Sequence, residues 1–191
     1  AYRSVSRPPE PPRAAGPIGG EVAGFPNNPI TGTTNPTIYQ TVRYNLAGYR
    51  LPATNGPCTV TLQFCEPHYD AAGVRVFDVK LQGRRVLKSL DIFARVGKNR
   101  ALDFTYTNVV VTNGWLDIDF VPVIEFPSIA GIVVEGNGFG WKVNCAGPAH
   151  GDYAADLPRI EAPKPPVPAT RDFYVDWATQ QFGRGIGEAA A

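Results

Sequence analysis

The chain has 191 residues, enough for one domain with additional segments, because single domains commonly run to about 100–150 residues. Its 18 basic and 17 acidic residues give a net charge of +1, which argues against nucleic acid or an anionic membrane as a partner. No apolar run approaches the roughly 18 residues of a membrane span, so we expect a soluble chain. Its 20 glycines and 19 prolines favour many turns, few long helices and hence an all-β fold.

Two N-terminal segments precede the first periodic pattern. Residues 1–17 hold five prolines and predict an extended Pro-rich linker. Residues 18–36 are dense in Gly, Pro, Asn and Thr without a clean period, which predicts an irregular loop on the domain surface.

Alternating apolar and polar residues predict the strands that follow. Residues 39–44 and 49–51 read as short strands separated by a break at 45–48, and Asn55-Gly56 predicts a turn into a strand over 58–64. The strand over 74–81 forms a hairpin with 85–88, whereas residues 89–96 are ambiguous. The remaining predicted strands are 101–106, 108–112, 115–121, 129–135 and 141–145. Short strands at this spacing indicate an antiparallel β-sandwich rather than βαβ units.

The C-terminal part changes character. Residues 158–170 predict a second Pro-rich linker, and Thr170 is a suitable N-cap for a short helix within 171–191. That helix has no obvious place in a sandwich, so we expect a strut or the start of a following domain. Methionine is absent even at position 1, which favours a piece of a longer polypeptide.

The three cysteines lack zinc-ligand spacing, so we expect no metal site. Cys58 and Cys65 belong to one predicted strand and lie too far apart to be bridged to each other. Buried free thiols and a disulfide from either of them to Cys145 are the two readings left open.

Several linked motifs carry a family resemblance. YQTVRY, LQFCE, RVFDVKLQG and LDIFARVG follow one another in an order that resembles the malectin family of carbohydrate-binding domains over residues 18–136. The resemblance implies a malectin-like, jelly-roll type sandwich. The family's opening strand, which reads like INxGGPA, does not precede Gly20, but KVNCAGPA at 142–149 is similar to it. We therefore expect a domain over 18–157 in which 142–157 supply a permuted edge strand, or a domain that is itself an insertion. The alternative is that a second malectin-like unit begins there.

The resemblance also implies four ligand-binding residues: Tyr39, His68, Tyr69 and Glu125. Aromatic faces suit the apolar faces of sugar rings, and carboxylates suit their hydroxyl groups. Three of these positions also have a structural reading: a core or rim tyrosine for Tyr39, a loop histidine bonded to backbone for His68, and an ion pair with Arg43 or Arg75 for Glu125. Glu66 is expected to accept N–H bonds from the loop that follows it.

No pattern in the chain predicts catalysis. Asp117 and Asp119 read as a solvated strand face rather than a pair of acids across a glycosidic bond, and no nucleotide or cofactor motif is present. We therefore expect a non-catalytic carbohydrate-binding module of an extracellular or periplasmic glycoside hydrolase, with the parent's catalytic domain or subunit as partner. The alternatives are a structural accessory domain without sugar affinity and a fragment that contributes loops to a shared active site.

Overall fold

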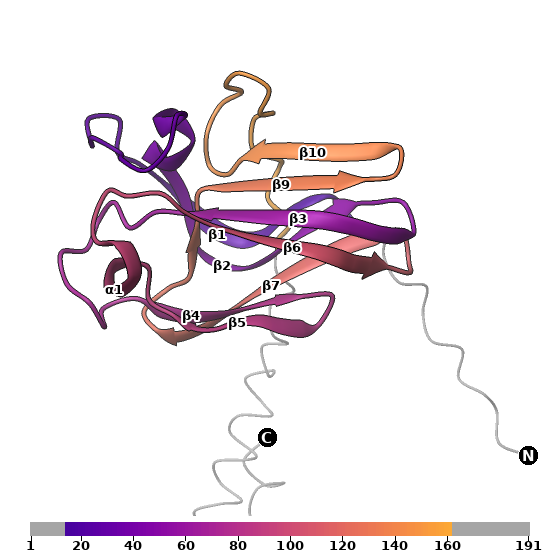
Figure 1. Ribbon diagram of the computed structural model, residues 1–191, viewed down its shortest axis with the longest axis horizontal. Coiled ribbons are helices and arrows are strands. Elements are labelled where there is room, and N and C mark those ends of the chain that lie inside the picture. The colour runs from indigo at the N-terminus through magenta and orange to yellow at the C-terminus, as the bar shows by residue number, and fades with distance from the viewer. Residues whose placement is uncertain (1–13, 162–191) are drawn as a thin grey trace, which may run out of the picture. The chain divides into compact units, whose positions relative to one another are not determined.

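The computed structural model describes residues 14–161, which form a sandwich of two antiparallel sheets (Figure 1). One sheet has the strand order β1-β2-β7-β4-β5 with β8 also paired to β2, and the other has the order β10-β9-β3-β6. The fold class predicted from the sequence is confirmed. The strands are β1 (Gly16–Gly24), β2 (Thr41–Pro52), β3 (Gly56–Phe64), β4 (Val76–Leu81), β5 (Arg84–Leu90), β6 (Leu102–Val111), β7 (Trp115–Ile124), β8 (Ser128–Ile129), β9 (Gly131–Gly136) and β10 (Phe139–Asn144).

The core lies between the two sheets and follows from alternation along the strands. Val60, Leu62 and Phe64 of β3 are fully buried, whereas the intervening Thr61 is partly exposed. Successive strand residues point to opposite faces, so one apolar face of each sheet meets the other. Burial of these faces supplies the main driving force for the sandwich.

Two predicted strand breaks are wrong, because β2 and β6 each continue through an asparagine in the left-handed conformation. Asn45 has φ 56° within the continuous β2, and Asn108 has φ 56° within the continuous β6. Asparagine tolerates the left-handed conformation better than most residues, which makes a continuous strand and a turn look alike in sequence. At Asn45, β2 changes its partner from β8 to β7.

The prediction of a loop over 18–36 is wrong for its first part, because β1 forms there. Residues 16–24 pair with β2, so Gly16 and Pro17 also belong to the domain rather than to the predicted linker. Gly19 and Gly20 have φ 70° and 88°, and the pairing shifts register beside them. Such a bulge removes the strict alternation that would have identified the strand. Between β1 and β2 lies the 3-10 helix η1 (Pro36–Gln40), which contains Tyr39.

The ambiguous segment 89–96 is divided at Asp91. β5 ends at Leu90, and Asp91 caps the short helix α1 (Ile92–Val96) by accepting a 2.9 Å hydrogen bond from the Ala94 N–H. The other carboxylate oxygen of Asp91 accepts from the Gly73 N–H at 2.6 Å, which connects α1 to the loop before β4.

Residues 139–160 supply an edge strand of one sheet and a segment that returns to the other sheet. β10 pairs with β9 and is an edge strand, which places residues 142–144 of the predicted 142–157 segment at a sheet edge. The strap, defined as residues 145–160, then returns to β1, where Ile160 bridges to Ile18. A permuted order remains a prediction. Residues 158–160 of the predicted linker 158–170 belong to this strap, whereas residues 162–170 and the helix predicted within 171–191 lie outside the described residues. Among the described residues, no helix is long and apolar enough to cross a membrane.

The three cysteines are free and buried. Burial raises the pKa of the Cys65 thiol to about 12, and burial also raises the pKa of Cys58 and Cys145. Because the thiolate is the reactive form, we expect no cysteine of the folded chain to react with a thiol-specific dye, and all three to react in denaturant without reductant. Fewer than three reactive thiols in denaturant would reveal a disulfide.

Candidate ligand pocket

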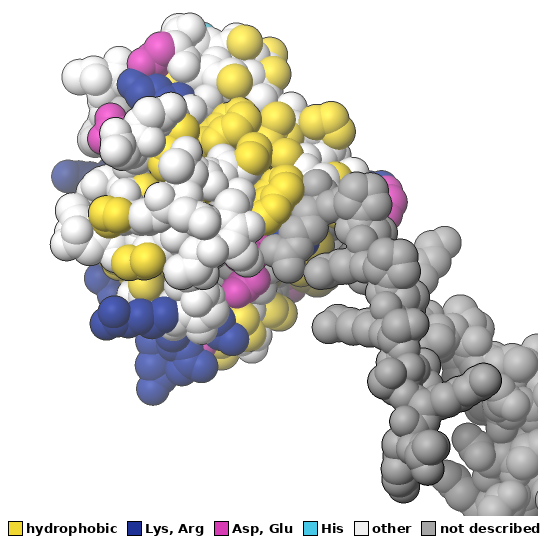
Figure 2. Space-filling model, turned by 90° about the vertical axis from the view of Figure 1, so that its right-hand side faces the viewer, with side chains coloured by type: hydrophobic (Ala, Val, Ile, Leu, Met, Phe, Trp, Pro, Cys, Tyr) yellow, Lys and Arg dark blue, Asp and Glu magenta, His cyan; other side chains and the backbone are white. Residues whose placement is uncertain are grey.

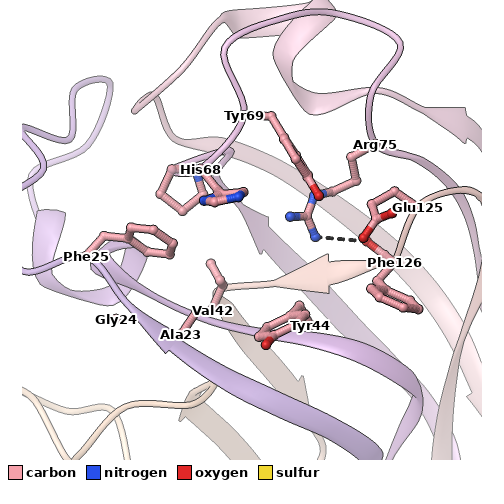
Figure 3. Close-up of a pocket in the computed structure, with 11 residues that line it drawn as sticks. Ala23, Gly24, Phe25, Val42, Tyr44, His68, Tyr69, Arg75, Glu125 and Phe126 are labelled. Atoms are coloured by element: carbon pink, nitrogen blue, oxygen red, sulfur yellow. Dashed lines mark hydrogen bonds between the residues drawn. The ribbon is translucent and has the colours of Figure 1, made fainter.

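A cavity of about 480 Å³ lies at the end of the sandwich where β1, β2 and the loops after β3 and β7 meet. Ala23 approaches from β1 and Phe25 from the residue after it, and Val42 and Tyr44 form the floor from β2 (Figure 3). The volume falls within the roughly 300–1,000 Å³ that is typical of small-molecule sites. We call this cavity the aromatic pocket.

Five ring side chains line the aromatic pocket: Phe25, Tyr44, His68, Tyr69 and Phe126. The ring centroids of Phe25 and His68 are 6.2 Å apart, and those of His68 and Tyr69 are 4.7 Å apart in an edge-to-face arrangement. His68 and Phe126 are exposed, whereas Tyr69 is half-buried. These rings present apolar faces to the cavity while the Tyr69 and Tyr44 hydroxyls add polar groups, a combination suited to sugar rings.

A buried ion pair joins the two walls of the pocket. The Arg75 Nε lies 2.8 Å from the Glu66 Oε2, with 8% of the arginine side chain and 2% of the glutamate side chain exposed. Arg75 also donates from Nη1 to the Phe126 carbonyl at 2.8 Å, and its guanidinium carbon lies 5.0 Å from the centre of the Tyr69 ring. Arg75 thereby connects the wall after β3 to the wall after β7.

Glu66 organises the loop that carries the two predicted aromatic contacts. Its Oε1 accepts the backbone N–H of His68 at 3.1 Å and of Tyr69 at 3.0 Å. The predicted structural role of Glu66 is therefore confirmed. A carboxylate that accepts backbone N–H groups holds the chain more firmly than a neutral acceptor does, so the ring positions are set before any ligand arrives.

Neighbouring segments brace the same loop from outside. The Asn28 side-chain amide donates to the Pro67 carbonyl at 2.9 Å, and the Asn99 backbone N–H donates to the Glu66 carbonyl at 3.0 Å. An exposed ion pair joins Lys98 to Asp70 at 2.6 Å. The long segment before η1 thus contributes directly to the pocket wall.

Glu125 projects into the pocket from a strained backbone. Its φ of 58° lies in the left-handed region, which costs an L-residue about 1–2 kcal/mol. Figure 3 shows its side chain beside Tyr69 and Arg75. Burial, followed by the negative charge of Glu125, raises the pKa of the Tyr69 hydroxyl, which keeps it a donor. Strain held in place by neighbouring contacts is a common feature of ligand sites.

The structure brings together three of the four predicted contacts. His68, Tyr69 and Glu125 line the aromatic pocket, whereas Tyr39 does not. Tyr39 is 2% exposed, and its hydroxyl donates to the Asp103 carboxylate at 2.7 Å. Burial, followed by the hydrogen bond to Asp103, raises the pKa of Tyr39. Its position fits the alternative reading of a core tyrosine.

The sequence reasoning missed Phe25, Tyr44, Arg75 and Phe126. Tyr44 closes the same YQTVRY motif as Tyr39, but the shift from η1 to β2 between them turns only Tyr44 toward the pocket. Phe25 and Phe126 stand in irregular segments, where no period assigns a side chain to a face. Sequence reasoning considered Arg75 only as a partner of Glu125, whereas Arg75 pairs with Glu66.

Within residues 14–161, the acidic residues Asp103 and Asp117 are engaged outside the pocket. Asp117 pairs with Arg50 at 2.6 Å on β7, and Asp103 binds Tyr39. Within residues 14–161, no group of three His, Cys, Asp or Glu side chains is placed to hold a metal ion. The arrangement is suited to holding a hydroxylated ligand.

Fold and pocket together define a β-sandwich domain of the carbohydrate-binding type. The malectin domain model matches residues 24–132, which is more than half of the chain. The chain belongs to the malectin family.

Relatives cover parts of the chain. Malectin of Mus musculus is 44% identical over 69 residues, which is 35% of this chain and 24% of that protein. A kinesin-like protein of Oryza sativa subsp. japonica is 29% identical over 127 residues, or 61% of this chain and 12% of that protein. The chain thus matches about a quarter of the length of malectin.

Solved structures share the fold. The β-glucuronidase of Bacteroides uniformis has a TM-score of 0.60 and 25% identity over 68% of this chain and 15% of that chain. The extracellular domain of ANXUR1 from Arabidopsis thaliana has a TM-score of 0.54 over 76% of this chain and 41% of that one. At 16% identity the second likeness concerns the fold alone.

Proposed function

We propose that this chain is a non-catalytic carbohydrate-binding module of a polysaccharide- or glycoside-degrading enzyme, and that it binds sugar in the aromatic pocket. The observation that carries the proposal is the set of five ring side chains around a cavity that also presents Tyr69, Glu125 and Arg75. The likeness to part of a bacterial β-glucuronidase supports a glycoside hydrolase as the parent. A location outside the cytoplasm, extracellular or periplasmic, belongs to the same proposal.

The charges of the pocket favour an uncharged sugar. The buried carboxylate of Glu66 balances the guanidinium of Arg75. Glu125 is exposed and forms no ion pair with another residue of 14–161, so its negative charge is not balanced by a neighbouring cation there. A uronic acid would bring a second carboxylate close to it, and two like charges at short distance repel. Hydroxyl groups, in contrast, donate to Glu125 without that cost.

A direct test is binding of glycans to the full chain. Tyr69→Ala is expected to weaken binding of a neutral glucoside or galactoside by about tenfold or more, because it removes a ring at the centre of the site. The melting temperature is expected to stay nearly unchanged, since Tyr69 is half-buried at the rim. Calorimetric titration and thermal unfolding measure the two quantities.

The matched control is Tyr153→Ala. Tyr153 is also half-buried, but it bonds Gln63 and does not line the pocket. Its replacement is expected to leave glycan affinity unchanged. Absence of binding to neutral and acidic glycans by the wild-type chain would overturn the proposal.

A second candidate function is a structural domain that packs on its parent enzyme. The observation that favours it is the exposed apolar group beside the pocket, in which Val123, Ile124 and Phe126 are 53%, 49% and 43% exposed. In that case, Val123→Ser would weaken association with the parent's catalytic domain while glycan binding is absent. The catalytic domain or subunit of the parent is the partner in both candidate functions.

A further inference from the structure

A second hollow of about 670 Å³ lies between the edge strands of the two sheets and shares no lining residue with the aromatic pocket. β5 ends the strand order of one sheet and β6 ends that of the other, so the hollow follows the open side of the sandwich. We call it the arginine groove. Its floor is formed by Val86 and Val109, and its rims are formed by residues 82–85 and 105–108.

The groove is basic and polar. Arg84 and Arg85 line it together with Thr105, Thr107 and Asn108, and no Asp or Glu is among its lining residues. Arg84 is exposed and forms no ion pair within residues 14–161. Arg85 lies 3.1 Å from Asp78, yet 51% of its side chain remains exposed. Figure 2 shows Lys and Arg side chains gathered at the lower edge of the face, at the height where Figure 1 places the β4–β5 hairpin.

Arg84 occupies a position where the strand pattern calls for an apolar side chain. It lies directly opposite Leu81 across the hairpin, and Leu81 is 3% exposed in the core. Opposite residues of an antiparallel pair point to the same face, so Arg84 points toward the other sheet at the mouth of the sandwich. Its guanidinium is therefore presented to the groove and not to the outer face of β5.

We propose that the arginine groove binds an anionic sugar chain, one that carries carboxylate or sulfate groups, independently of the aromatic pocket. A guanidinium recognises such groups with two parallel hydrogen bonds, and the threonine hydroxyls and the asparagine amide are suited to the sugar hydroxyls beside them. The hollow is lined by consecutive residues of both edge strands, 84–86 and 105–110, an arrangement that suits a chain ligand. The opposite charge preferences of the two sites make them distinguishable.

Two acidic residues next to the arginine groove limit where the anionic groups of the ligand can bind. Asp117 and Asp119 line an adjoining depression that shares Gln82 and Val110 with the groove. Asp117 is paired with Arg50, whereas burial raises the pKa of Asp119, with the nearby Asp117 adding to it. The anionic groups of the ligand are therefore expected near Arg84 and β6, away from Gln82.

Arg84 also protects the edge strand β5 from pairing with another chain, because an inward-pointing charge blocks strand addition. That role requires only a positive charge. Ligand binding requires the planar guanidinium as well, so Arg84→Lys separates the two roles.

The test is titration of the full chain with a uronic acid oligosaccharide, a sulfated one and a neutral one of equal length, at low salt. Arg84→Ala is expected to weaken binding of the anionic oligosaccharide by about tenfold or more, and Arg84→Lys by several-fold. Lys88→Ala removes the same charge from β5 outside the groove and is expected to change affinity less than about twofold. Comparison of the affinities for the sulfated and the uronic acid oligosaccharide identifies the preferred anionic group.

Two results would overturn the proposal: binding of neither anionic oligosaccharide, or equal losses from Arg84→Ala and Lys88→Ala. Tyr69→Ala distinguishes this site from the aromatic pocket. It is expected to leave binding of the anionic oligosaccharide unchanged, even if the chain binds no neutral sugar. Loss of anionic binding in Tyr69→Ala would place that ligand in the aromatic pocket and would contradict a second site.

Discussion

Glu66→Ala is expected to destabilise the domain by about 3–5 kcal/mol and to abolish sugar binding. The change leaves the Arg75 guanidinium buried at 8% exposure without its 2.8 Å partner, and an unpaired buried charge is among the most destabilising defects of a fold. It also frees the N–H groups of His68 and Tyr69, which hold the pocket loop. Urea unfolding measures the free energy, and calorimetric titration with a neutral glycoside measures binding.

Asp70→Ala is the control for Glu66→Ala. Asp70 is a carboxylate of the same loop and pairs with Lys98, but 80% of its side chain is exposed. Exposed pairs contribute roughly 0–1 kcal/mol, so stability should change little. Glu66→Gln keeps an acceptor for the two N–H groups and is expected to cost less than Glu66→Ala. Equal unfolding free energies for Glu66→Ala and Asp70→Ala would contradict the role assigned to the buried pair.

Asp156→Ala is expected to destabilise the domain by a similar amount, about 3–5 kcal/mol, through a second buried ion pair. Arg43 and Asp156 form an ion pair in which each side chain is 8% exposed. The Asp156 carboxylate also accepts from the Tyr49 hydroxyl at 3.1 Å, from the Ala146 N–H at 2.6 Å and from the Leu157 N–H at 2.9 Å. One carboxylate therefore attaches the strap to β2 and sets its local course.

Asp152→Ala is the matched control on the strap. Asp152 pairs with Lys142 on the surface, with 66% of its side chain exposed, and its loss should change the unfolding free energy by less than about 1 kcal/mol. If Asp156→Ala unfolds at the same urea concentration as the wild type, the strap is not part of the cooperative unit. In that case residues 145–160 would have to be assigned outside the domain.

Much of the architecture was predictable because burial of one face of a strand produces an alternating pattern of apolar and polar residues. The alternation in β3, β4 and β7 identified these strands, since each has one face in the core. β1 gave no such trace because its glycines form a bulge at a sheet edge and its side chains are mostly partly exposed. The break expected at 45–48 and the break expected between the strands 101–106 and 108–112 are wrong for a related reason, because a left-handed asparagine looks the same inside a strand as in a turn.

The candidate site was predictable where one loop carries it. Glu66, His68 and Tyr69 follow shortly after β3, so their closeness in space could be predicted from their closeness in sequence. Phe25, Tyr44 and Phe126 come from segments that only the closing of the sandwich brings together. Tyr39 lies outside the pocket and Tyr44 lines it because the chain changes from a 3-10 helix to a strand within the four residues between them.

By itself, the sequence determined the all-β class, the family resemblance, the absence of a dominant charge and the loop that carries His68 and Tyr69. These properties depend on composition and on neighbours along the chain. The tertiary structure was needed to establish that Glu66 pairs with Arg75, that Tyr39 lies outside the pocket, and that Arg84 of the β4–β5 hairpin points toward the opposite sheet. Such pairings depend on register and on the packing of one sheet against the other, and no local pattern of residues encodes either of them.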